Sequence, residues 1–158
     1  MTAVPIITKT DIEAIIPHAG DMCLLEQVIS FSNEEIICRT QSHLNTDNPL
    51  KTNGKLSKMH LIEYGAQAIA VHGGLLERDS NNDQPKLGYI ATVKAVKWGD
   101  FDPLTELLEI KANAVMRDEI SKLYEFTIID AQLRNVCSAR VMVIHPNSDE
   151  KVDSIGKI

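Results

Sequence analysis

The chain lacks the features that identify several large classes of protein. It has 16 Lys and Arg against 22 Asp and Glu, a net charge of -6, and therefore no basic surplus with which to bind nucleic-acid phosphates. It has no run of 18 apolar residues free of charge, and its start, MTAVPIITKTD, lacks the basic and then apolar pattern of a signal peptide. We therefore expect a cytoplasmic protein that binds neither nucleic acid nor membrane.

Cysteine is also scarce. The three cysteines are odd in number and show neither a CxxC motif nor zinc-like spacing, so we expect buried, reduced thiols, no metal site and no cofactor. No internal repeat is visible. With 158 residues, of which 44% are apolar, the chain suits a single core. We predict one domain over residues 1–145 and a polar C-terminal tail over 146–158.

Hydrophobic periodicity predicts a short helix, a long helix and several strands. Thr10 to Glu13 fits a capping box, which would start a helix over residues 11–16 that Pro17 ends. A loop rich in Asn, Thr, Pro and Gly then spans residues 43–55. Alternating or strand-like runs lie at residues 22–32, 34–42, 87–98, 108–114, 124–128 and 137–143. The prediction is an α+β fold in which an antiparallel sheet of five to six strands wraps around one long buried helix.

The predicted long helix, residues 57–77, reads SKMHLIEYGAQAIAVHGGLLE and is apolar nearly all the way round. Such a helix is normally buried, and an ionised carboxylate within it needs a partner or a proton. Glu63 is that carboxylate, and 3.6 periodicity places His60 and Gln67 on its stripe. His72, which precedes two glycines, is expected near the C-terminal end of the helix.

Two segments carry a family resemblance. IPHAGDMCLLEQV (residues 16–28) resembles the N-terminal signature of the hotdog-fold (3R)-hydroxyacyl-ACP dehydratases, in which Pro-His precedes a Leu-Leu-acidic strand. LIEYGAQAIAVHGG (residues 61–74) resembles the central helix of that family, with its Glu-Ala-Met-Ala-Gln motif. The branch most similar to the chain is associated with aryl-polyene clusters. The resemblance covers roughly residues 10–145 and implies the hotdog fold.

The resemblance also implies a chemistry. Related dehydratases hold an acyl thioester in a tunnel at a dimer interface, where a loop His removes the α-proton and a helix carboxylic acid helps to expel the β-hydroxyl. Glu63 matches that acid, and burial would raise its pKa. The implied ligand is an acyl-ACP or acyl-CoA thioester. The implied assembly is a homodimer, or a hetero-oligomer with a related dehydratase subunit.

The catalytic His of the family does not carry over. Asn48 stands in its place, and an amide cannot act as a base. His43, His60 and His18 are the candidate replacements, with His18 also a candidate for substrate binding.

Gln67 and Tyr89 are further candidates for substrate binding. Three functions stay open: a 3-hydroxyacyl-ACP dehydratase (a lyase) of fatty-acid or polyene biosynthesis, a non-catalytic acyl-thioester-binding or partner subunit, and a hotdog acyl thioesterase.

Overall fold

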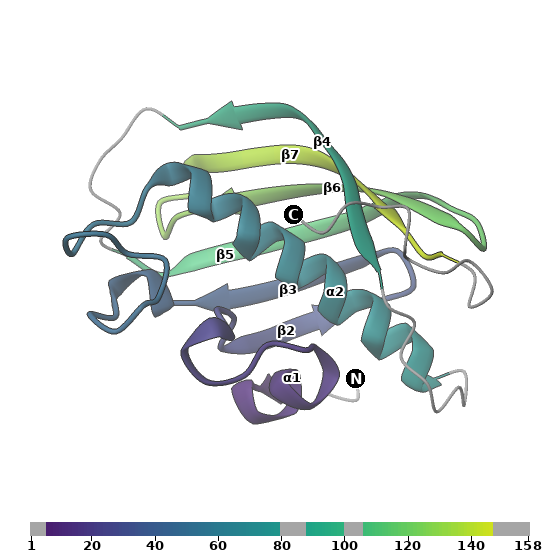
Figure 1. The fold of residues 1–158 in the computed structure, drawn as a ribbon, viewed down its shortest axis with the longest axis horizontal. Helices are drawn as coiled ribbons and strands as arrows, with labels where there is room; N and C mark the ends of the chain where they lie inside the picture. The colour runs from purple at the N-terminus through teal and green to yellow at the C-terminus, as the bar shows by residue number, and fades with distance from the viewer. Residues whose placement is uncertain (1–5, 80–87, 100–105, 147–158) are drawn as a thin grey trace.

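Seven strands and two α-helices make up the part of the chain that the computed structural model describes, residues 6–79, 88–99 and 106–146. The elements, which single 3₁₀ turns join at three places, are β1 (Ile7–Thr8), α1 (Lys9–Ile15), β2 (Gln27–Phe31), β3 (Glu35–Thr40), α2 (Leu61–Asp79), β4 (Tyr89–Trp98), β5 (Leu108–Arg117), β6 (Ser121–Ile129) and β7 (Asn135–Ile144) (Figure 1). All but residue 146 of the predicted C-terminal tail lies outside the described residues.

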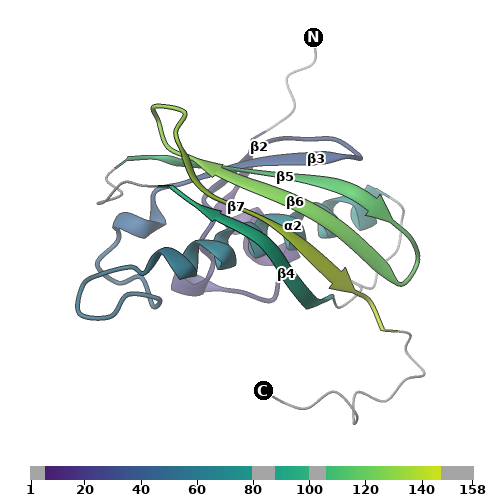
Figure 2. The ribbon, with the colours of Figure 1, turned by 90° about the horizontal axis from the view of Figure 1, so that it is seen from above.

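The strands form one antiparallel sheet in the order β1-β2-β3-β5-β6-β7-β4. Helix α2 lies across one face of this sheet, and the sheet curves around it toward β4 (Figures 1 and 2). The predicted α+β class is therefore confirmed. The sheet has seven strands instead of five to six because β1 is only two residues long, too short to produce an alternating pattern.

The two faces of the sheet differ as the alternating pattern predicts. Leu108, Ile110 and Ala112 of β5 are buried toward α2, while Glu109 and Lys111 point outward. Cross-strand ion pairs line the outer face: Arg39 Nε to Glu109 at 3.1 Å, Lys111 to Glu35 at 3.1 Å, and Arg140 to Glu125. Exposed pairs of this kind contribute at most about 1 kcal/mol each, so burial of the inner face decides the register.

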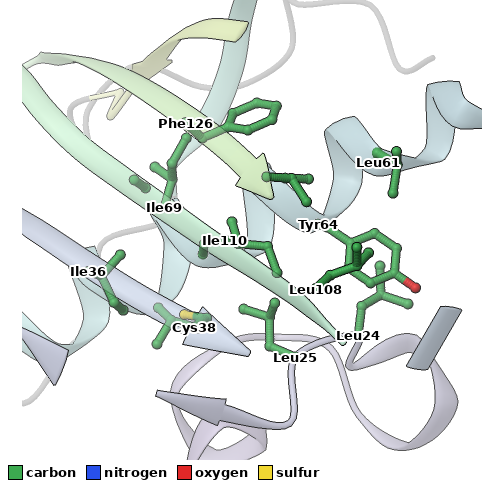
Figure 3. Close-up of a cluster of buried hydrophobic side chains, with 14 of the residues drawn as sticks. Leu24, Leu25, Ile36, Cys38, Leu61, Tyr64, Ile69, Leu108, Ile110 and Phe126 are labelled. Carbon is green, nitrogen blue, oxygen red and sulfur yellow. The ribbon is translucent and has the colours of Figure 1, made fainter. Parts of the chain in front are cut away.

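Helix α2 approaches the sheet closely because it has a glycine at the contact. A Cβ on Gly65 would lie only 2.5 Å from the ring of Phe126 on β6. The same layer holds fully buried Leu61, Tyr64 and Ile110, to which the segment before β2 adds Leu24 and Leu25 (Figure 3). A fully buried side chain of this size contributes about 1.5 to 3 kcal/mol, so this layer is the main source of stability.

The N-terminal cap of α1 lies two residues earlier than predicted. The Asp11 carboxylate accepts from the Thr8 amide at 3.0 Å and from the Thr8 hydroxyl at 2.9 Å. These hydrogen bonds hold the pKa of Asp11 below its usual value. Thr8 and Asp11 thus form the capping box that the sequence had assigned to Thr10 and Glu13.

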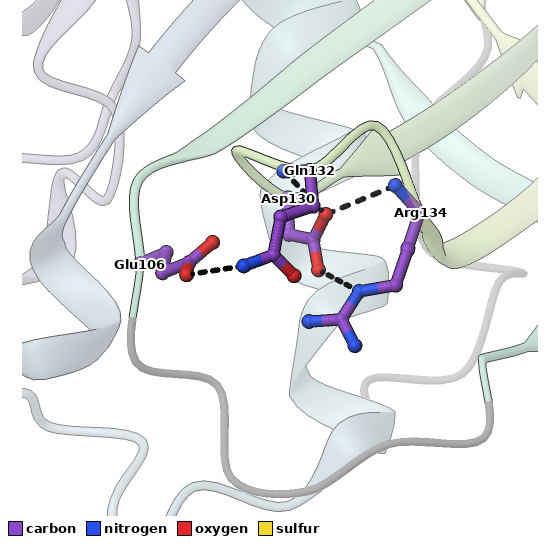
Figure 4. A network of polar contacts seen from close by, with 4 residues as sticks. All are labelled: Glu106, Asp130, Gln132 and Arg134. Atoms are coloured by element: carbon purple, nitrogen blue, oxygen red, sulfur yellow. Dashed lines mark hydrogen bonds and ion pairs between the residues drawn. The ribbon is translucent and has the colours of Figure 1, made fainter.

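The turn between β6 and β7 is built on one buried carboxylate, that of Asp130. Asp130 accepts from the amides of Gln132 and Arg134, each at 2.9 Å, and from the Arg134 guanidinium at 2.8 Å (Figure 4). The Gln132 side chain in turn donates to Glu106 at 2.9 Å. The turn is thereby connected to the chain that enters β5.

His72 is fully buried in the core, because α2 continues to Asp79 instead of ending at the two glycines. Its Nε2 lies 2.8 Å from the Ser32 carbonyl, which can only accept, so Nε2 carries the proton. Nδ1 then accepts from the Tyr124 hydroxyl at 2.8 Å. Burial lowers the pKa of His72 and raises that of Tyr124 to about 12, so both groups are neutral at pH 7.

The three cysteines are buried and unpaired, as the sequence predicts. Burial raises the pKa of the Cys38 thiol to about 12 and that of Cys137 to about 11, which leaves both protonated and unreactive at neutral pH.

Among the described residues, no helix is long and apolar enough to cross a bilayer.

A methyl group added at Gly65 should destabilise the fold. The new Cβ would overlap the Phe126 ring, an overpacking that costs about 1 to 3 kcal/mol, and this outweighs the gain of about 1 kcal/mol in helix propensity. Urea unfolding should therefore show a lower midpoint for Gly65→Ala. Gly73→Ala is the matched control, because a Cβ there meets nothing within 4 Å and its midpoint should rise. Equal midpoints for the two variants would contradict the close contact.

Acid should destabilise the protein through His72. The pKa of His72 in the folded state lies below 6.5, the ordinary value for histidine. As the pH falls through 6.5, the unfolded chain therefore binds a proton at His72 that the folded protein does not bind. Stability is therefore present above pH 6.5 and is lost as the pH falls, by up to about 1.4 kcal/mol per pH unit. In His72→Gln the free energy of urea unfolding should fall less between pH 7 and pH 5. Buried His43, whose pKa burial also lowers, contributes to the slope that remains.

Candidate active site

The loop that carries Asn48 is fixed to α2 by a buried network. The side-chain nitrogen of Asn48 donates to the Ser42 backbone carbonyl and to the Tyr64 hydroxyl, each at 3.0 Å. Its side-chain oxygen accepts from the backbone amide of Leu50 at 2.9 Å. The Ser42 hydroxyl lies 3.0 Å from that of Tyr64 and donates to the Leu24 carbonyl at 2.6 Å. Both amide protons of Asn48 are thus used within the fold.

A cavity of about 440 Å³ opens along α2. Its walls are α2, the end of α1 with the residues up to His18, and parts of β4, β6 and β7. Most of the lining is aliphatic and includes Ile15, Ile16, Ile90 and Val143. The site is therefore an apolar groove into which a few polar groups project.

His18 and Glu63 meet in the wall of this cavity. His18 Nε2 lies 3.6 Å from Glu63 Oε1, and the two side chains are 32% and 37% exposed. The expectation that Glu63 is buried was wrong for this chain by itself, because the sheet covers only one side of α2. Helix α1 ends at Ile15, and Pro17, which cannot continue a helix, directly precedes His18. A carboxylate and an imidazole are the groups most used in acid-base catalysis.

Gln67 lies one turn further along α2 and also lines the cavity. Its oxygen accepts from the Leu24 amide at 2.9 Å, and its nitrogen donates to the Met22 carbonyl at 2.7 Å. These bonds hold the segment after His18 against the helix. Gln67 therefore helps to fix the distance between His18 and Glu63.

The other predicted site residues lie away from the cavity walls. Asn48 and His43 do not line the cavity and are buried, at 6% and 4% exposure, and burial lowers the pKa of His43. His60 lies in the 3₁₀ turn Lys58–His60, where three residues per turn replace the 3.6 on which its predicted stripe depends. Tyr89 is 40% exposed on the edge strand, although its neighbours Gly88 and Ile90 line the cavity.

Sequence reasoning missed the residues that close the far end of the cavity. Lys122 and Tyr124 reach it from β6, His145 from the end of β7, and Glu77 from the last turns of α2. They belong to three separate stretches of sequence, and no motif connects them. Among the described residues, no cluster of three or more His, Cys, Asp or Glu could hold a metal ion.

Solved structures of other proteins share this architecture. The dehydratase heterocomplex ApeI:P from Xenorhabdus doucetiae contains a chain that is 27% identical, with a TM-score of 0.79, covering 92% of this chain and 97% of that one. A hypothetical thioesterase with coenzyme A from Streptococcus pneumoniae TIGR4 is 15% identical, with a TM-score of 0.58 over 76% of this chain and 84% of that one. The E. coli PaaI protein is 13% identical, with a TM-score of 0.55 over 74% and 80%.

These likenesses confirm the predicted hotdog fold. A search of the curated proteins finds no match. The ApeP-like family, described as ApeP dehydratase, matches residues 10–154, which is nearly the whole chain. The resemblance seen in the sequence is thereby confirmed, and the chain belongs to the ApeP-like dehydratase family.

Proposed function

We propose that this chain acts in the dehydration of 3-hydroxyacyl thioesters in polyene or fatty-acid biosynthesis, with His18 and Glu63 as its acid-base pair. The observation that carries the proposal is the distance of 3.6 Å between His18 Nε2 and Glu63 Oε1 in the wall of an apolar cavity. Membership of the dehydratase family supports the reaction class. The acyl group arrives on ACP or coenzyme A.

The reaction needs one group to take a proton and one to give a proton. Removal of the α-proton and departure of the β-hydroxyl as water convert the 3-hydroxyacyl thioester to the enoyl thioester. Neutral His18 accepts the α-proton, and protonated Glu63 donates to the leaving hydroxyl. Asn48 holds the loop in place by hydrogen bonds and takes no part in proton transfer.

The unpaired edge of the sheet at β4 is evidence for an assembly with a second hotdog subunit. In the described residues the outer edge of β4 pairs with no strand, and Tyr89 and Trp98 on that strand are 40% and 42% exposed. An open edge with exposed aromatic residues favours pairing with another sheet. The related ApeI:P structure is a heterocomplex. We infer that β4 joins a second subunit, either a copy of this chain or a related dehydratase.

Removal of either member of the acid-base pair should abolish turnover without unfolding the protein. Glu63→Gln and His18→Gln keep the size of the side chains, which are both about one third exposed, so the melting temperature should change little. Conversion of 3-hydroxyacyl-CoA to enoyl-CoA, followed by mass spectrometry, should fall about 10²-fold or more in each variant. His60→Gln is the control and should keep wild-type turnover, because His60 does not line the cavity.

The same assay separates the open alternatives. Release of free coenzyme A from plain acyl-CoA, lost in Glu63→Gln, would identify a thioesterase. A wild-type chain that binds acyl-CoA but converts neither substrate would identify a binding subunit. Full dehydration by His18→Gln would remove His18 from the proposed pair.

Pairing through strand β4 should determine the oligomeric state of the protein in solution. We expect light scattering at micromolar concentration to give twice the chain mass of 17.5 kDa, and Trp98→Lys to shift the protein toward the monomer, because a lysine on an edge strand opposes pairing. Val115→Lys is the control, since Val115 is 52% exposed on an interior strand. A monomeric wild type would contradict the homodimer and favour the related subunit as partner.

A further inference from the structure

We infer that the face of α2 that lines the cavity determines how long an acyl chain the protein can bind. Gly73 lies at the position that the end of the longest accepted chain reaches. This inference rests on the proposed function. Between Glu63 and Glu77, a line of cavity-lining residues at successive spacings of three and four along α2 consists of Ala66, Ala70 and Gly73, and Gln67 and Ile69 line the cavity beside it. None of the three residues on this line has a side chain longer than a methyl group. Along this line no large side chain of α2 blocks the way from Glu63 to Gly73.

The space at Gly73 belongs to the cavity and is not needed for packing. A Cβ added at Gly73 would meet nothing within 4 Å. Its neighbour Gly74 differs, since a Cβ there would collide with the side chain of Ile15. A glycine inside a helix is less stable than alanine, and close packing gives no reason for it at position 73. The empty volume at this position is what a bound chain would fill.

The helix sets the length. An α-helix rises about 1.5 Å per residue, so Gly73 lies about 15 Å along the axis from Glu63. An extended chain advances about 1.2 Å per bond, which follows from about 3.6 Å for the three bonds of one residue. The path from the reactive carbons to Gly73 therefore holds about 12 further carbons.

Charged groups end the apolar path just beyond Gly73. Glu77 follows one turn later on α2, and Lys122 and His145 line the same end of the cavity. A hydrocarbon that reached these polar groups would offer them no hydrogen bond. Chains that extend past Gly73 should therefore bind less well, whereas shorter chains should each gain from added apolar contact.

The test uses saturated acyl-CoA and 3-hydroxyacyl-CoA of 6 to 18 carbons, with calorimetric Kd values for the first series and kcat/KM for the second. For wild type we expect Kd to fall with length up to about 15 carbons in total and to rise beyond. Gly73→Leu should weaken the binding of the longest accepted chains at least 10-fold and leave 6 to 8 carbons unchanged. In Ala70→Leu the limit should lie about four carbons below that of Gly73→Leu, because three residues of helix span about 4.5 Å.

Controls keep these outcomes distinct. Arg78→Leu adds a leucine to an exposed site of α2 outside the cavity and should leave the length profile unchanged. Melting temperatures should show Gly73→Leu folded, since leucine favours a helix more than glycine does. The inference would be overturned if Gly73→Leu and Ala70→Leu both kept the wild-type length profile. It would also be overturned if they weakened binding equally at every chain length or lowered the mass of the oligomer. Length-dependent binding without dehydration by wild type would refute the proposed reaction and retain the measuring role of α2.

Discussion

Both the core and the cavity of this fold depend on the packing of one helix. Helix α2 is the centre of the core, and it is also a wall of the cavity. Its sequence is apolar on nearly every side, but one sheet can cover only part of a helix. Gly65 lets the covered side approach Phe126 closely. Residues on other sides of the helix, Glu63, Ala66 and Ala70 among them, line the cavity.

The polar groups around α2 separate into two sets. In the first set, Asn48, Ser42 and Tyr64 satisfy one another and fix the loop, which leaves them little capacity to bind a substrate. In the second set, His18 and Glu63 lie 3.6 Å apart and are both partly exposed. Buried polar groups with complete hydrogen bonds stabilise structure, whereas reactive groups need access.

The sequence predicts the fold better than the site. Period-2 alternation gave the inward side of β5, and the apolar run with Glu63 gave α2, because both patterns are local. The pairing of His18 with Glu63 joins residues 45 positions apart, and no periodicity relates them. The stripe that included His60 failed for a local reason, since the 3₁₀ turn before α2 changes the angle between successive side chains. The length of β1 was likewise below what a pattern can reveal.

The family signature and the geometry place the proposed catalytic nitrogen on different segments. In related dehydratases the His belongs to the loop before the helix, where this chain has Asn48, a residue engaged in three hydrogen bonds. Proton transfer requires a nitrogen near the carboxylate, whichever segment supplies it. In the proposed reaction the Pro-His pair supplies it, and the two hydrogen bonds of Gln67 to Leu24 and Met22 hold the chain after His18 against α2. A residue outside the reacting pair thus sets the distance on which the proposed chemistry depends.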